Sequence, residues 1–150
     1  MTSSFSSRAV SLLSVSTLLR LIAVGGLVVD ARVHLKLAVA YESIKSSAVS
    51  QGDLFRFEAG LAIAAAVLIL LVRRSVTDFF AAAVAGGGLA ALLAYRYIDL
   101  GAIGPLPPMY EPVWYPDKVD TCIAQAIATA ASLCVLLVAL YRGRRAGRTA

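Results

Sequence analysis

The chain has 150 residues, of which 59% are hydrophobic and 15% are charged, and its formal net charge is +5. An ordinary soluble domain carries about 25% charged residues, so the composition argues against a soluble protein. The apolar residues fall into blocks of roughly 20 residues, the length that a helix needs to cross a bilayer. The basic residues gather at the ends of these blocks, so membrane topology explains them and no nucleic-acid partner is expected. We therefore expect one integral membrane domain over residues 1–150, an all-α bundle of four transmembrane helices.

The first apolar block predicts a helix over about residues 11–44, which is longer than the ~30 Å hydrocarbon core of a bilayer. Arg20 lies deep in this helix and needs a carboxylate, backbone carbonyls or a route to the headgroups. We expect the helix to continue past Asp30 without a break, which places Asp30, His34 and Tyr41 on one face. That face is either an ordinary helix end with interfacial charges or a polar site turned towards the bundle interior.

Two further helices are expected over about residues 53–72 and 77–98, joined by a tight turn. Small residues recur every four positions in the second of these helices, a pattern that lets a neighbouring helix approach closely. The members of this stripe are Ala82, Gly86, Ala90 and Ala94.

A proline-rich loop follows over residues 100–119, and its prolines forbid a regular helix. Its aromatic residues suit the headgroup layer, so we expect the loop to form a rigid cap over the bundle. A fourth helix is expected over about residues 120–141. It carries a polar stripe that we expect to face other helices, made of Thr121, Gln125, Thr129 and Ser132.

The charges between the helices predict the orientation of the chain. Arginines dominate one side of the membrane, where Asp78 is the only acid, and acidic residues outnumber basic ones on the other side. By the positive-inside rule, both termini lie in the cytoplasm of a multi-pass protein of the cell membrane. The arginines of the inner side are Arg8, Arg73, Arg74, Arg142, Arg144, Arg145 and Arg148.

Ionisable and phenolic side chains from three helices are expected to meet at the outer end of the bundle. These candidate ligand-binding residues are Asp30, His34, Tyr41, Glu58, Arg96 and Asp99. A buried arginine without a carboxylate is expensive, so we expect Arg96 to pair with Asp30 or otherwise with Glu58. The cluster either holds the helices together or forms the floor of a small outward-facing pocket.

The sequence contains no recognisable catalytic motif. Its single histidine, His34, gives too few ligands for an ordinary metal site, and no serine stands in a nucleophile context. Nucleotide-binding glycine patterns do not occur either. We therefore expect no catalytic residue, no metal and no cofactor.

Two short runs carry a resemblance to a known group of proteins, His34-Leu35-x-Leu37-x3-Tyr41-x2-Ile44 and Gly52-x-Leu54-Phe55. They resemble a pattern in small four-span membrane proteins of actinobacteria, some of which are distantly similar to DoxX proteins. The Ala-, Val- and Arg-rich composition fits such a source. The resemblance covers the first helix, the first outer loop and the start of the second helix. It implies a four-helix bundle in the cell membrane and assigns no activity.

Three functions stay open on this basis. The favoured one is a non-enzymatic subunit of a larger membrane complex, bound within the lipid bilayer to a partner protein or to further copies of itself, because the helix faces are small and no catalytic motif occurs. The second is an outward-facing binder or transporter-like module for a small or lipidic ligand. The third is an accessory enzyme that acts on a quinone or a lipid.

Overall fold

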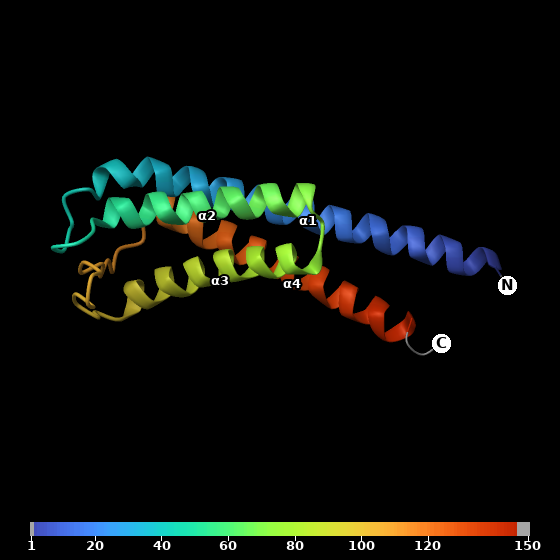
Figure 1. Cartoon of the computed structure of the whole chain (residues 1–150). Coiled ribbons are helices and arrows are strands. Elements are labelled where there is room, and N and C mark those ends of the chain that lie inside the picture. The colour runs from blue at the N-terminus through green and yellow to red at the C-terminus, as the bar shows by residue number, and fades with distance from the viewer. Residues whose placement is uncertain (1, 147–150) are drawn as a thin grey trace.

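The computed structural model describes the backbone of residues 2–146 and the side chains of residues 15–145. Four helices make up the fold: α1 (Thr2–Ala40), α2 (Gln51–Leu71), α3 (Ser75–Tyr97) and α4 (Pro116–Ala146) (Figure 1). Within the described residues, β pairing is limited to two isolated bridges in the loops. The prediction of an all-α fold with four helices is therefore confirmed.

Local capping sets helix bounds that differ from the predicted ones. α1 begins at Thr2 and ends at Ala40, and α2 begins at Gln51, before the predicted residue 53. The Ser50 hydroxyl accepts a hydrogen bond from the Asp53 amide at 3.0 Å, and the Asp53 carboxylate accepts one from the Ser50 amide at 3.1 Å. This reciprocal capping box satisfies amide groups that the first turn leaves unpaired, so α2 starts directly after Ser50.

α4 also begins earlier than predicted, at Pro116 instead of residue 120. Proline suits the first position of a helix because the N–H that it lacks has no helical partner there. The early start moves Lys118 from the predicted loop onto the first turn of α4 and brings it near the end of the bundle.

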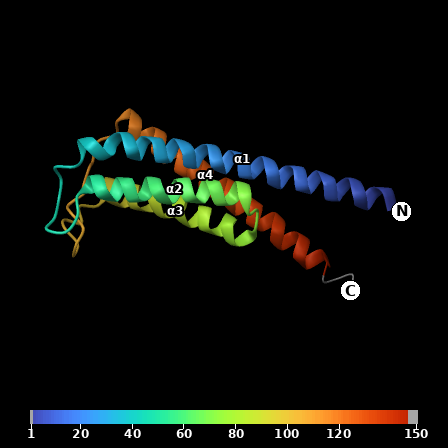
Figure 2. The ribbon, with the colours of Figure 1, turned by 45° about the horizontal axis from the view of Figure 1, so that its top comes forward.

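The four helices form a ring in which each helix packs against two neighbours. α1 contacts α2 and α4, α3 contacts the same two helices, and the diagonal pairs hardly touch. Figures 1 and 2 show both termini at the end where α2 turns into α3, which we call the terminal end. The loops over residues 41–50 and 98–115 lie at the opposite end, the loop end. A shared end for the two termini is what the predicted topology requires.

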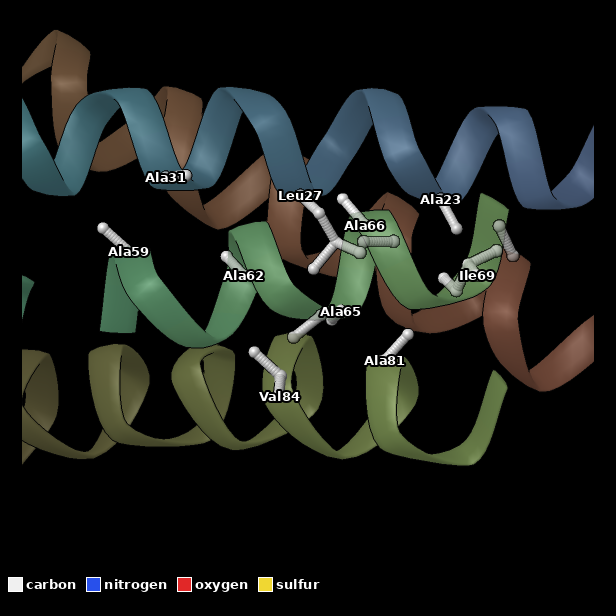
Figure 3. Close-up of a cluster of buried hydrophobic side chains, with 13 residues drawn as sticks. Ala23, Leu27, Ala31, Ala59, Ala62, Ala65, Ala66, Ile69, Ala81 and Val84 are labelled. Atoms are coloured by element: carbon white, nitrogen blue, oxygen red, sulfur yellow. The ribbon is translucent and has the colours of Figure 1, made fainter. Parts of the chain in front are cut away.

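The core of the bundle is built mainly from alanine. A cluster at the centre joins all four helices and contains few larger side chains (Figure 3). Small side chains let the helix backbones approach closely, which strengthens van der Waals packing where lipid removes the hydrophobic driving force. The cluster consists of Ala23, Leu27, Ala31, Ala59, Ala62, Ala65, Ala66, Ile69, Ala81, Val84, Ala85, Ala128 and Ala131.

The backbones of α1 and α4 approach each other closely at Gly26. A Cβ atom added at Gly26 would lie 2.6 Å from the carbonyl oxygen of Ala124, closer than real Cβ contacts. Glycine is therefore required here, and the contact fixes how α1 and α4 slide past each other. The register of the polar residues further along both helices depends on this contact.

The predicted small-residue stripe of α3 faces its neighbours in part. Ala82 is buried, and a Cβ atom at Gly86 would make an ordinary contact with Thr129 of α4 at 3.4 Å. Ala90 is exposed on the outside of the bundle. Ala94, nearer the loop end, is half-buried, so Ala90 is the one exposed member of the stripe.

Large apolar side chains point outward from the bundle. Leu71 is 76% exposed, and Leu18, Phe57 and Leu137 are each at least 60% exposed. A small-residue interior beneath a surface of large apolar side chains suits a lipid environment. α2, α3 and residues 116–145 of α4 are each long and apolar enough to cross a membrane, which supports a multi-pass membrane protein.

α1 is not among these three candidate spans over its described side chains, because it carries four charged residues between positions 20 and 36. The deepest of these, Arg20, has the carboxylate partner that its position requires. Its Nε and Nη2 atoms donate to the two oxygens of Asp78 at 2.8 and 2.7 Å, and Nη2 also reaches the Arg73 carbonyl at 3.3 Å. Asp78 is 1% exposed, so this bidentate pair fastens α1 to the first turn of α3.

We expect Arg20→Leu and Asp78→Leu each to destabilise the protein by about 3 kcal/mol, because each leaves one buried charge without its partner. The double variant should be clearly more stable than the sum of the two losses predicts. Thermal unfolding in detergent measures this coupling. Arg32→Leu is the matched control, since Arg32 is an exposed arginine of the same helix. Additive losses for Arg20 and Asp78 would contradict the ion pair.

Candidate functional site

A cavity of about 320 Å³ opens at the loop end of the bundle, between all four helices and the 98–115 loop. This volume lies at the lower limit of typical small-molecule pockets, which span roughly 300–1,000 Å³. Most of the wall is apolar, and several polar side chains converge on it. The polar lining relevant to the site is His34, Tyr41, Glu58, Tyr115, Lys118 and Thr121.

The imidazole of His34 is held in place by a fully buried carboxylate. His34 Nδ1 lies 3.0 Å from Asp30 Oδ1 and 3.0 Å from the Asp30 carbonyl oxygen, one turn earlier on α1. Asp30 Oδ1 also accepts a hydrogen bond from Gln125 Nε2 of α4 at 2.9 Å. The edge of the ring contacts Phe55, with 5.2 Å between centroids. With Nδ1 engaged by Asp30, Nε2 is the nitrogen left to interact with a ligand.

The helical spacing correctly predicted that Asp30 and His34 share a face, and α1 is unbroken between them. Tyr41 follows directly after α1 and lines the cavity beside His34. Asp30 itself does not line the cavity, because it lies behind the imidazole with 0% exposure. Its role in the site is to orient His34.

Glu58 lines this cavity, and one of its carboxylate oxygens is buried without a partner in the protein. Among the described residues, seven buried side-chain N and O atoms make no hydrogen bond, and two of them, Glu58 Oε1 and Thr121 Oγ1, belong to residues of the cavity lining. Buried polar atoms are normally paired, and leaving one unpaired costs about 1–3 kcal/mol. The residues that line the cavity therefore carry polar atoms whose hydrogen-bonding capacity is unused.

Gly88 makes room for this arrangement on α3. A Cβ atom at Gly88 would lie 2.7 Å from Glu58 Oε1, and Gln125 Nε2 would be closer still. Any larger residue would push one of these side chains away. The absence of a side chain at Gly88 thus lets polar groups from α2 and α4 meet beside α3.

Aromatic rings form the wall between α1 and the proline-rich loop. The hydroxyls of Tyr41 and Tyr115 lie 3.0 Å apart, and the Tyr41 ring packs against Phe55 at 5.2 Å. Burial, together with the hydrogen bond to Tyr41, raises the pKa of the Tyr115 phenol above its usual range, so it stays neutral. Lys118 Nζ lies 5.1 Å from the Tyr115 ring centroid and donates to the Glu111 carbonyl at 2.6 Å. The loop is therefore fastened to both α1 and α4.

The predicted pairing of Arg96 with Asp30 or Glu58 is wrong. The Arg96 guanidinium lies over the rings of Trp114 and Tyr97, at 5.2 and 5.1 Å from their centroids, and makes no ion pair with a described carboxylate. The proline-rich loop folds back onto the end of α3 and offers an aromatic face, which attracts a cation without a carboxylate.

Asp99 also lies outside the cavity. Its carboxylate accepts a hydrogen bond from the Gly101 amide at 3.1 Å, in an exposed turn after α3. Of the six residues predicted from the sequence, the structure brings four together: His34, Tyr41 and Glu58 in the lining, and Asp30 behind it. Arg96, on the last turn of α3, and Asp99, in the loop after it, interact with loop residues instead.

The sequence analysis did not assign three groups of this site. Gln125 and Thr121 were expected only as part of a polar stripe, and Lys118 was placed in the loop. The helical register that starts at Pro116 would have placed Lys118, Thr121 and Gln125 on one face of α4. The described residues contain no group of three or more His, Cys, Asp or Glu side chains that could hold a metal ion.

Comparisons of this sequence with models of protein families, with curated proteins and with solved structures find no match. The site therefore has to be interpreted from its own geometry.

We expect Gly88→Ala to be about 1–3 kcal/mol less stable than Gly87→Ala, because a methyl group at Gly88 displaces the Gln125 amide from the buried Asp30 carboxylate. Gly87 is the matched control on the same helix, since an added Cβ there meets nothing within 4 Å. Both variants gain the same helix propensity, so their difference in thermal unfolding temperature isolates the contact. Equal stabilities would show that the Gln125–Asp30 hydrogen bond contributes little.

Proposed function

We propose that this chain is a four-span protein of the cell membrane that binds a small amphipathic ligand in its loop-end cavity. The observation that carries the proposal is the combination of apolar walls with buried polar atoms that have no protein partner, Glu58 Oε1 and Thr121 Oγ1. Binding pockets combine a mostly apolar lining with a few polar groups that orient the ligand. A structural polar cluster would instead satisfy its own hydrogen bonds.

The pairing of three of its four charged residues, Arg20, Asp30 and Lys36, supports α1 as the fourth span. Arg20 is bound by Asp78, and Asp30 by His34 and Gln125. Lys36 reaches Asp117 at 2.8 Å near the loop end. Paired charges are far less expensive in a membrane than isolated ones. Between these charged residues, α1 carries large apolar side chains on its outer face, as the other helices do.

The positive-inside rule supports an orientation with both termini in the cytoplasm, which turns the loop end and its cavity outward. Exposed Arg73 and Arg74 lie at the α2–α3 turn, and Arg144 and Arg145 lie near the end of α4. All four therefore lie at the terminal end of the bundle.

The other hypotheses from the sequence stay predictions. The exposed apolar surface admits a partner protein or a second copy, but it selects neither, and lipid covers it equally well. An accessory enzyme acting on a quinone or lipid would use the same cavity. The resemblance to four-span actinobacterial proteins rests on the two short runs near His34 and Phe55. The cavity favours ligand binding over the subunit hypothesis because polar side chains from several elements line a space that a small molecule can enter.

We expect Ala91→Phe to displace the ligand, because Ala91 is an exposed residue of the cavity lining and a phenyl ring added there would occupy space that the ligand needs. Native mass spectrometry of protein extracted with its lipids is the measurement. The wild type should carry a stoichiometric small molecule that Ala91→Phe lacks. Ala64→Phe is the matched control, since Ala64 is an exposed alanine of α2 outside the cavity. A bound molecule retained equally in all three proteins would show that it binds elsewhere.

Labelling by a membrane-impermeant thiol reagent tests the topology in intact cells. In a background with Cys122→Ala and Cys134→Ala, Ser47→Cys should be labelled, because the 41–50 loop is expected outside. Gly143→Cys should be labelled only after the cells are opened. Labelling of Gly143→Cys in intact cells would overturn the proposed orientation.

A further inference from the structure

We infer that the ligand of the loop-end cavity carries a protonated amine, a primary alkylammonium, with the Glu58 carboxylate as its counter-ion. This inference rests on the proposed function and narrows its ligand to one chemical class. Three independent features of the cavity support it: the balance of charges, the kind of hydrogen-bonding groups available, and the aromatic wall.

Carboxylates outnumber cations around the cavity. Glu58 and Glu111 line it and Asp30 lies directly behind His34, whereas Lys118 is the one lysine or arginine in the lining. Lys118 is also already engaged, because it donates to the Glu111 carbonyl and lies against the Tyr115 ring. Even with a protonated His34, these three carboxylates outnumber the cations of the lining, and Arg96 lies outside the lining over the rings of Trp114 and Tyr97. A cationic ligand would restore neutrality in this apolar setting, and an anionic ligand would add to the excess.

The unused polar atoms near the floor are acceptors. Glu58 Oε1 is a carboxylate oxygen, which only accepts hydrogen bonds when it is ionised, and the Thr121 hydroxyl can accept one as well. His34 Nε2 accepts in the tautomer that keeps the Nδ1 proton towards Asp30. An ammonium group brings three donors and no acceptor, so it matches this set. Gln125, the amide nearest to Glu58, already donates to Asp30.

Aromatic rings line the same cavity as Glu58. Tyr41, Phe55, Tyr95 and Tyr115 belong to the cavity wall. Ring faces attract organic cations, and aromatic walls recur in sites that bind them. Leucine side chains complete the wall, so the remainder of the ligand is apolar. The ligand expected in this cavity is therefore a small amphipathic primary amine.

Three probes with one carbon skeleton test the charge preference: 4-phenylbutylamine, which is protonated at neutral pH, 4-phenylbutan-1-ol and 4-phenylbutyrate. Binding is measured by calorimetry on the full chain in lipid nanodiscs, with Ala91→Phe nanodiscs as the blank for partitioning into lipid. The amine should bind at least about tenfold more tightly than the alcohol, because a charge-assisted hydrogen bond replaces a neutral one. The carboxylate should bind most weakly.

Glu58→Gln should remove the preference for the amine, since the amide keeps the size of the side chain and loses its charge. Asp99→Asn is the matched control, because Asp99 lies in the exposed turn outside the cavity, and it should keep the preference. A preference that survives in Glu58→Gln would overturn the role of Glu58. The comparison of the three probes on the wild type decides the charge preference even if Glu58→Gln does not fold.

The remaining outcomes separate this inference from the proposed function. Equal binding of the three probes, above the Ala91→Phe blank, would overturn the amine and leave an amphiphile-binding cavity. Tightest binding of 4-phenylbutyrate would also overturn the amine and would assign the recognition to Lys118. If no probe binds above the blank, the inference is overturned, and the test for a co-purified ligand shows whether the proposed function fails with it.

Discussion

The constraint on which this structure depends is the burial of charge along α1. The helix carries ionisable residues along the length of an apolar bundle. Each ionisable side chain that faces the interior therefore needs a partner at the same height along the bundle axis. Arg20 meets Asp78 on the diagonally opposite helix, and Asp30 meets both His34 and Gln125. Because Asp78 lies on α3 and Gln125 on α4, these two partners fix the height and rotation of α1 relative to α3 and α4. The polar contacts therefore specify the arrangement that the alanine contacts then tighten.

The distribution of small residues along the bundle determines both where the helices pack closely and where the cavity opens. Gly26 lets α1 touch the backbone of α4, and that contact places Asp30 level with Gln125. Towards the loop end the inner residues become larger and polar, so the helices no longer meet in this way. Gly88 continues the use of glycine there, but it admits the ends of polar side chains instead of a backbone. The cavity thus begins where alanine stops filling the bundle interior.

Much of this fold follows from short-range patterns that the sequence displays. Apolar runs of sufficient length predict the helices, and the spacing of Asp30 and His34 predicts their shared face. What the sequence does not display is the register between distant segments. The position of Gln125 opposite Asp30 depends on the contact at Gly26, and the position of Trp114 over Arg96 depends on how a proline-rich loop folds back. Charge complementarity alone predicts a carboxylate partner for Arg96. It cannot predict an aromatic partner from a loop, because loop residues follow no periodic pattern.

The alanine core has a consequence for the entropy of assembly. Alanine has no side-chain rotamers, so packing Ala62, Ala65 and Ala128 together removes no side-chain conformational freedom. The side chains that do have rotamers, such as Leu18, Phe57 and Leu71, lie on the outside, where lipid tails are fluid. The association of the helices is therefore opposed mainly by the loss of freedom of whole helices, and much less by the freezing of side chains. In such a bundle, weak dispersion contacts and a small number of polar pairs are sufficient to hold one arrangement.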